Sequence, residues 1–248
     1  SAVVGANLSG LTILNEQYGL VTGDGIRRID LKSLNNVRIK NERLLCFYNS
    51  IIYNGKVLSN DTYKDESKVK YYDVNELIAA KEGEAPAVTE LDIIQKQKIN
   101  FVLAKDGNVY TLESADNGCN IVKIKNDFTL EKVFANFQPA KGPYHSSPTI
   151  GMVASETENI IYLVSTDGAI YKYILGDSDS LKAPFIAAES GVSITAPLQL
   201  NQQSGELYVT YTEERKDESK IVVYSKDGKV LHTVDCGESV PSQILFNN

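Results

Sequence analysis

Histidine is the side chain best suited to proton transfer near neutral pH, and the chain contains two of them. His145 follows a proline-containing segment, and His232 lies in the short run LHTV. The motifs HExxH, GxSxG and CxxC, which mark zinc hydrolases, serine hydrolases and thiol or zinc sites, do not occur. We therefore predict no catalytic residue and no metal ligand, and we interpret both histidines as ordinary solvated or core side chains.

Other metal-binding side chains are equally sparse. The segment from Asp177 to Ser180, DSDS, offers carboxylates, but a calcium loop needs more of them and a distal glutamate at a set spacing. We therefore predict a polar turn there. The cysteines are Cys46, Cys119 and Cys236, an odd and widely spaced set that fits neither a disulfide framework nor a zinc site.

The best candidates for ligand binding are Lys141, Tyr144 and His145. They lie in residues 134–147, FANFQPAKGPYHSS, a segment with two prolines and no strand pattern that leads into a predicted strand at Pro148. Loops positioned by a rigid scaffold often carry binding residues. We predict that these three side chains contact a ligand; the alternative is an ordinary connecting loop.

Composition excludes some classes of function. The 248 residues include 25 Lys or Arg and 32 Asp or Glu, for a net charge of −7. A nucleic-acid partner would require a basic surface against the phosphate backbone, so none is predicted. No apolar run approaches the roughly 20 residues that a membrane-spanning helix needs. A soluble domain whose core one chain of this length can fill is expected.

The elements that must position these residues are strands. The run Ile160–Val164 is apolar on both faces, reaches Asp167-Gly168, and continues into the β-rich run Ile170–Ile174. Two such runs joined by Asp-Gly predict a β-hairpin with a type I′ turn. A third strand is predicted upstream, starting at Pro148, where proline is tolerated as a first residue.

This layout recurs along the chain. We expect similar units after Pro86, Pro148, Pro197 and Pro241. Repeats of roughly 40 to 50 residues that each contain several strands are typical of propeller blades. The sequence thus predicts an all-β fold, a single β-propeller over residues 1–248, with five blades and six as the alternative. One short helix, of one or two turns, is predicted in residues 75–84, NELIAAKEGE.

The two ends of the chain are predicted to share a blade. Residues 1–15 read as strand, turn, strand, without a leading proline strand, and the C-terminal QILFNN supplies that missing strand. We therefore expect the C-terminal strand to close the ring in the N-terminal blade, because closure removes exposed sheet edges. Deletion of residues 240–248 is then expected to destabilise the chain severely.

The residues SSPTIG and IYLVSTDGAIYKYI resemble the blade repeat of quinoprotein-like propellers. That group includes pyrroloquinoline-quinone dehydrogenases and a bacterial outer-membrane assembly factor. The resemblance implies a propeller and, since such propellers are exported, a secreted or periplasmic location, with which a start at Ser1 agrees. In that family a stacked Trp and a calcium ion hold the quinone. The chain has no Trp, so we predict that it binds no quinone cofactor.

Two functions remain open at this point. The first is a non-enzymatic propeller that binds a protein, peptide or other ligand on its rim or at the mouth of its channel. The alternative is a propeller-type hydrolase, lyase or carbohydrate-binding protein with carboxylates at the central channel. In a propeller, the segment holding Lys141, Tyr144 and His145 enters an innermost strand and faces that mouth, by analogy with the fold.

Overall fold

The computed structural model describes residues 10–23, 25–40, 50–60, 67–84, 86–95, 100–138, 151–213, 218–239, 244 and 246. The chain forms two compact units, which are Ser1–Phe101 with Asn126–Phe128, and Val102–Lys125 with Thr129–Asn248. Among the described residues, strands dominate, and the helices are one short α-helix and one 3₁₀ turn. None of the described helices is long and apolar enough to cross a membrane.

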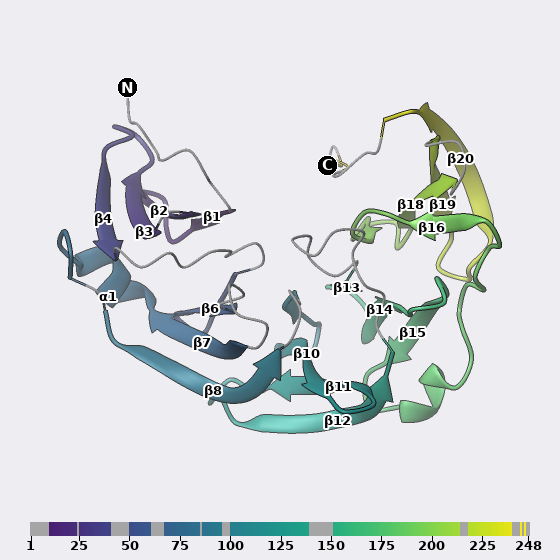
Figure 1. Ribbon diagram of the computed structural model, residues 1–248, viewed down its shortest axis with the longest axis horizontal. Coiled ribbons are helices and arrows are strands. Elements are labelled where there is room, and N and C mark those ends of the chain that lie inside the picture. The colour runs from purple at the N-terminus through teal and green to yellow at the C-terminus, as the bar shows by residue number, and fades with distance from the viewer. Residues whose placement is uncertain are drawn as a thin grey trace. The chain divides into compact units, whose positions relative to one another are not determined.

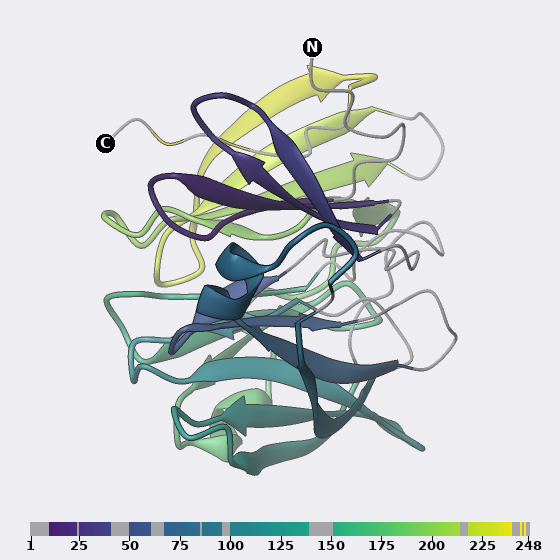
Figure 2. The same cartoon turned by 90° about the vertical axis from the view of Figure 1, so that its left-hand side faces the viewer.

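The first unit contains two four-stranded antiparallel sheets, each a meander of consecutive strands (Figure 1; the first sheet is purple in Figure 2). The first sheet consists of β1 (Gly10–Ile13), β2 (Tyr18–Gly23), β3 (Gly25–Asp30) and β4 (Asn36–Lys40). The second consists of β5 (Ile51–Tyr53), β6 (Lys56–Asn60), β7 (Ser67–Asp73) and β8 (Val88–Gln95).

A hydrophobic core joins these two sheets, with Leu20, Ile26 and Ile39 from the first and Val57 and Tyr72 from the second. The helix α1 (Val74–Ala79) adds its buried Leu77 to the same core. It begins where the Asp73 carboxylate accepts the N–H groups of Asn75 and Glu76 at 2.8 and 3.1 Å, a typical N-cap. The short helix predicted in residues 75–84 is thereby confirmed.

The second unit contains three antiparallel sheets. The third sheet of the chain consists of β9 (Val102–Leu103), β10 (Val109–Ala115), β11 (Gly118–Ile124) and β12 (Leu130–Phe137). The fourth consists of β13 (Met152–Ala154), β14 (Ile160–Val164) and β15 (Ile170–Ile174). The fifth consists of β16 (Val192–Ile194), β17 (Gln199–Leu200), β18 (Leu207–Glu213), β19 (Ser219–Tyr224) and β20 (Val230–Gly237), with both β16 and β17 paired to β18.

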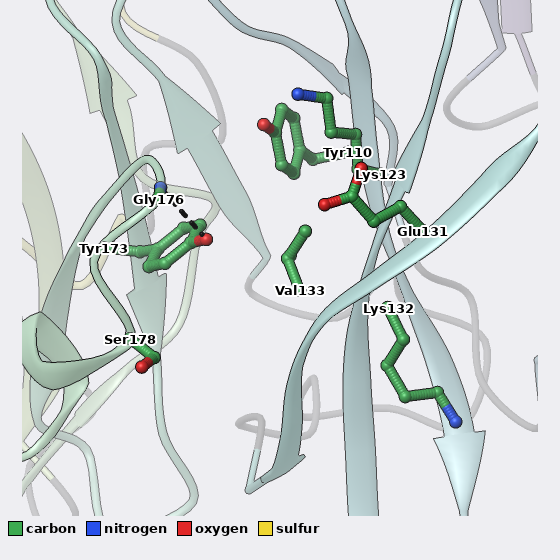
Figure 3. Close-up of a pocket in the computed structure, with 8 residues that line it drawn as sticks. All are labelled: Tyr110, Lys123, Glu131, Lys132, Val133, Tyr173, Gly176 and Ser178. Atoms are coloured by element: carbon green, nitrogen blue, oxygen red, sulfur yellow. Dashed lines mark hydrogen bonds between the residues drawn. The ribbon is translucent and has the colours of Figure 1, made fainter.

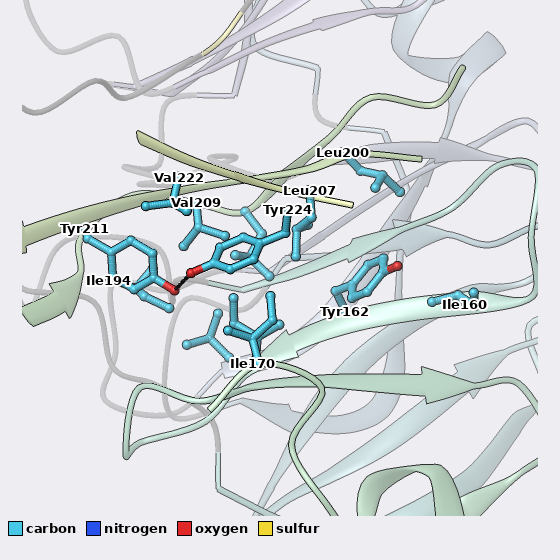
Figure 4. Close-up of a cluster of buried hydrophobic side chains, with 13 residues drawn as sticks. Ile160, Tyr162, Ile170, Ile194, Leu200, Leu207, Val209, Tyr211, Val222 and Tyr224 are labelled. Carbon is cyan, nitrogen blue, oxygen red and sulfur yellow. Dashed lines mark hydrogen bonds between the residues drawn. The ribbon is translucent and has the colours of Figure 1, made fainter. Parts of the chain in front are cut away.

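The core between the fourth and fifth sheets is the larger of the two clusters described here (Figure 4). Tyr162 and Ile170 of the fourth sheet pack with Leu207 and Val209 of the fifth, and all four are nearly inaccessible to solvent. All five residues of β14 are buried, as expected from a run that is apolar on both faces. Each such side chain contributes roughly 1.5 to 3 kcal/mol by burial.

Five sheets in the described part of the chain agree with the five-blade prediction, and the all-β class is confirmed. In the second unit, edge strands of successive sheets are neighbours, because β13 contacts both β9 and β17. Edge strands that adjoin one another in this way are the arrangement around the central channel of a propeller.

The predicted hairpin at Asp167-Gly168 is present, but its turn is not type I′. Gly168 N donates to Ser165 O at 3.0 Å, and Ser165 N donates to Ala169 O at 2.9 Å. Only Gly168 has a positive φ, 85°, so this is a type I turn followed by a left-handed glycine. The Asp167 carboxylate accepts the N–H of Ala169 at 3.1 Å, a local bond that is common for aspartate in turns.

The prediction that a unit of the third sheet begins after Pro86 is wrong. The strand that follows Pro86 is β8, which pairs with β7 as the last strand of the second sheet. Helix α1 and the turn after it reverse the chain, so the residues after Pro86 fall beside β7. After Pro197, in contrast, the chain does enter an edge of its own sheet, at β17.

The predicted closing strand QILFNN lies mostly outside the described residues. Its members Ile244 and Phe246 are described and belong to no strand. Among the described residues, β1 to β4 alone form the first sheet. Closure of the ring by the C-terminal segment therefore stays a prediction.

Candidate functional site

A cavity of about 260 Å³ opens in the second unit, between the third sheet and the end of β15 (Figure 3). Its wall carries hydroxyl, ammonium and carboxylate groups beside little apolar surface. The lining residues are Tyr110, Lys123, Glu131, Lys132, Val133, Tyr173, Gly176 and Ser178.

Tyr110 and Lys123 form one wall, and both are fixed by Asp106. They face each other across β10 and β11, and the Lys123 ammonium lies 5.8 Å from the centre of the Tyr110 ring. The Tyr110 hydroxyl donates to Asp106 Oδ2 at 2.9 Å, and Lys123 Nζ lies 2.9 Å from the same oxygen. One carboxylate therefore holds both groups at the edge of the cavity.

These contacts keep Asp106 charged and Tyr110 neutral. Burial alone would raise the pKa of Asp106, but hydrogen bonds from Lys123, Tyr110 and Asn108 outweigh burial, and the net effect lowers the pKa. Burial and the bond to Asp106 raise the pKa of Tyr110 far above its ordinary value. Tyr110 thus remains a hydroxyl donor at any physiological pH.

Tyr173 forms the opposite wall with the loop that follows β15 (Figure 3). Its hydroxyl oxygen accepts the N–H of Gly176 at 3.4 Å, and its O–H remains able to donate to a ligand. Burial raises the pKa of Tyr173, which keeps the hydroxyl neutral. Ser178 starts the 3₁₀ turn Ser178–Leu181, whose N-cap is Asp177.

The outer rim of the cavity is charged and belongs to β12. Glu131 pairs with Lys125 at 2.9 Å, and Lys132 pairs with Glu113 at 3.3 Å. The Lys132 side chain extends away from the two tyrosines in Figure 3. The hydrogen bond from Lys125 lowers the pKa of Glu131 and keeps it ionised.

The cavity is lined by hydrogen-bonding groups, and the charged groups among them are paired. Lys123, Glu131 and Lys132 each have an oppositely charged partner, so no uncompensated charge faces the opening. Its lining offers hydroxyl and ammonium donors together with one carboxylate, a set that fits a small polar molecule. In the described parts of the chain, no group of three His, Cys, Asp or Glu side chains is placed to hold a metal ion.

The described residues include only some of those that the sequence singled out. Lys141, Tyr144, His145 and Cys46 lie outside the described residues, so the predicted binding site stays a prediction. His232 is exposed on β20 and does not line the cavity. The segment from Asp177 forms the capped 3₁₀ turn, close to the predicted polar turn. Cys119 is buried in β11, and burial raises the pKa of its thiol to about 11.

Sequence reasoning missed this cavity because its residues come from four strands and a loop spread over residues 110–178. One local signal was available. A β-hairpin that places Tyr110 opposite Lys123, next to a turn carrying Asp106, predicts the network but not the cavity beside it.

Solved structures of similar fold are β-propellers. Prolyl oligopeptidase B from Galerina marginata, bound to a 35mer substrate, matches with a TM-score of 0.59 at 11% identity, covering 94% of this chain and 36% of that chain. The β-propeller domain of Cps50 (Swd1) from Myceliophteria thermophila matches with a TM-score of 0.55 at 11% identity, covering 95% and 75%. Virginiamycin B lyase from Staphylococcus aureus matches with a TM-score of 0.52 at 14% identity, covering 98% and 75%.

These matches define the class of the protein as a β-propeller, and at such identities they establish its fold alone. The chain spans about a third of the length of the prolyl oligopeptidase. A family model, the domain of unknown function DUF5074, matches residues 3–247, and the chain belongs to that family. No curated protein sequence matches it.

Proposed function

We propose that residues 1–248 form a single β-propeller domain that binds a protein or peptide ligand and catalyses no reaction. The observation that carries this proposal is the contact of β13 with β9 and with β17, which brings together one edge strand from each of three sheets. In a propeller, one edge strand of every blade lines the central channel. Residues 139–150 precede Gly151 and β13 in the sequence, which is why we assign the contact residues to this segment, by analogy with the fold.

The proposed contact residues are Lys141, Tyr144 and His145. Tyrosine supplies a large contact area at small cost in side-chain entropy, and it is enriched where interfaces derive most of their affinity. Lysine and histidine beside it favour an acidic or carboxyl-terminal ligand group. The cavity at Tyr110 and Tyr173 lies in the same unit and offers further hydrogen bonds.

The ionisation of the described carboxyl groups also supports binding over acid–base catalysis. A hydrolase or lyase with channel carboxylates requires a carboxyl group whose pKa is raised toward neutrality. Among the described carboxyl groups, those with a shifted pKa all have it lowered by hydrogen bonds; they are Asp30, Asp73, Asp106, Glu131 and Asp167. Carboxylates held in this way accept hydrogen bonds and do not donate protons.

Selection of a random peptide library on the immobilised chain tests the proposal. Enriched peptides are labelled, and their affinities are measured by fluorescence anisotropy for the wild type, for Lys141→Ala/Tyr144→Ala/His145→Ala, and for the control Lys229→Ala/His232→Ala. The control removes the exposed side chains of Lys229, in the turn before β20, and of His232, in β20. A loss of at least tenfold in the triple variant alone supports the proposal. Failure to enrich any peptide, or equal binding by all three chains, overturns it.

A further inference from the structure

The fifth sheet has a second face, opposite the core that it shares with the fourth. Leu200 and Leu207 point into that core. Side chains alternate along a strand, so the neighbouring pair Gln199 and Tyr208, which face each other across β17 and β18, lies on the opposite face. The cross-strand row continues through Val223 to His232.

Ile244 and Phe246, the described residues near the C-terminus, contact this pair on the second face. Ile244 N donates to Gln199 Oε1 at 2.8 Å. The Phe246 ring lies 5.0 Å from the Tyr208 ring at 67°, a favourable edge-to-face contact. Both Ile244 and Phe246 are half-buried. The backbone N–H of Ile244 is therefore matched by the acceptor of Gln199, and the ring of Phe246 by the ring of Tyr208.

We propose that Gln199 and Tyr208 form a peptide-docking notch that is occupied by the C-terminal segment of the same chain. The notch recognises a backbone N–H at one position and an aromatic side chain two residues later. Ile244 and Phe246 have this spacing, and in an extended chain it places two side chains on one face. This site is independent of the loop that holds Lys141, Tyr144 and His145.

Tyr208 makes a second contact besides that with Phe246, and this contact orients its ring. Its hydroxyl donates to Glu206 Oε2 at 3.2 Å, so the ring edge and face remain available to Phe246. Beyond the notch, at the outer end of the same face, Val234 is 51% exposed. Ile244 and Phe246 cover the end of this face at Gln199 and Tyr208, whereas farther along it Thr210 and Val223 are buried, with 2% and 4% exposed. In the proposed notch these two residues, Ile244 and Phe246, act as a displaceable latch.

Competition measures the latch directly in the full chain. The probe is the labelled peptide VPSQILFNN, the sequence of residues 240–248, and its binding is followed by fluorescence anisotropy. A tethered occupant competes at an effective concentration in the millimolar range, so the wild type should bind the probe weakly. Phe246→Ala empties the notch in cis and should raise the affinity for the probe at least tenfold.

Matched variants assign that binding to the notch. Leu245→Ala changes the neighbouring side chain and should bind the probe as the wild type does. The double variant Tyr208→Leu/Phe246→Ala should bind the probe as weakly as the wild type does. The altered probe VPSQILANN, which lacks the phenylalanine, should bind Phe246→Ala equally weakly. Equal affinity of the wild type and Phe246→Ala, or a gain that survives Tyr208→Leu, overturns the proposal.

A second measurement covers the case in which Phe246→Ala does not fold. Exchange of the Ile244 amide hydrogen is followed by NMR in the wild type and in Gln199→Ala. Loss of the acceptor should speed exchange at least tenfold, whereas an unchanged rate contradicts the notch. A dimer of the wild type that disappears in Tyr208→Leu would overturn the proposal in favour of the segment of a second copy as the occupant.

Discussion

Two hairpins of the second unit have the same turn and different places in their sheets. At Ala104–Asn108, Gly107 N donates to Ala104 O at 2.9 Å, and at Ser165–Ala169 the equivalent bond is 3.0 Å. Gly107 and Gly168 have similar φ values of 74° and 85°. Yet the turn at Ala104–Asn108 joins β9 and β10, the first two strands of the third sheet. The turn at Ser165–Ala169 joins β14 and β15, the last two strands of the fourth sheet.

The difference shows that a turn sets the pairing of two strands but not their distance from the sheet edge. The strand before the first turn, β9, has two residues, and its Leu103 is 45% exposed. The strand before the second turn, β14, has five residues that are all buried. Neighbouring sheets and strands, rather than the turn, decide which of the two becomes central.

The largest effect is expected at a third turn in the sheet of the first hairpin. Gly118 has a φ of 119°, and a Cβ there would lie 2.5 Å from Phe137 O. Gly118→Ala is therefore expected to lose about 3 kcal/mol of unfolding free energy, from backbone strain and the clash. Gly107→Ala meets open space and should lose only about 1 kcal/mol. Urea denaturation compares them, and equal losses would contradict the clash.

Local patterns predicted much of this fold for a physical reason. Alternating apolar runs and Asp-Gly turns act within a few residues, so the hairpin at Ser165–Ala169 and the short helix after Asp73 could be predicted from local sequence. The place of β8 could not be read, because its pairing with β7 depends on a chain reversal through α1. The cavity also escaped prediction, since Tyr110 and Tyr173 meet only after two sheets pack.

The aspartates of the two turns differ in what they hold together. Asp106 accepts bonds from Tyr110 and Lys123, with 21% of the lysine side chain exposed. Asp167 accepts from Ser165 and from Ala169 N, and the Ser165 hydroxyl also reaches Ala169 O at 3.0 Å. Asp106→Ala leaves a buried hydroxyl and an ammonium without their acceptor and should cost about 2 kcal/mol, against about 1 kcal/mol for Asp167→Ala. Chemical denaturation measures both, and a larger loss for Asp167→Ala would reverse the comparison.

Tyr110 and Tyr171, each three residues after the glycine of its turn, extend the comparison of the two hairpins. Tyr110 is 2% exposed and donates to Asp106. Tyr171 is half-buried and meets Phe137 edge-on, with ring centres 5.8 Å apart. Removal of one buried hydrogen bond by Tyr110→Phe should cost about 1 kcal/mol, while Tyr171→Phe should be nearly neutral. Thermal unfolding of both variants measures the difference in stability loss. An unchanged stability of Tyr110→Phe would show that the hydrogen bond from its hydroxyl contributes nothing.

The smallest expected effect appears only in acid. Burial opposes the charge of Asp106, but the hydrogen bonds from Lys123, Tyr110 and Asn108 outweigh it and lower its pKa below the ordinary value of 3.8. The unfolded chain therefore takes up this proton at a higher pH than the folded chain does. Stability from Asp106 is complete above pH 3.8 and is lost as the pH falls through the lower, folded value.

Asp106→Asn keeps the shape and cannot titrate, so its melting temperature should fall less between pH 5 and pH 3 than that of the wild type. The pKa of Asp167 is also lowered, chiefly by Ser165, so Asp167→Asn should flatten the same fall. An acid slope in Asp106→Asn as steep as in the wild type would mean that other carboxylates govern acid unfolding, and that the network at the cavity is not among its causes.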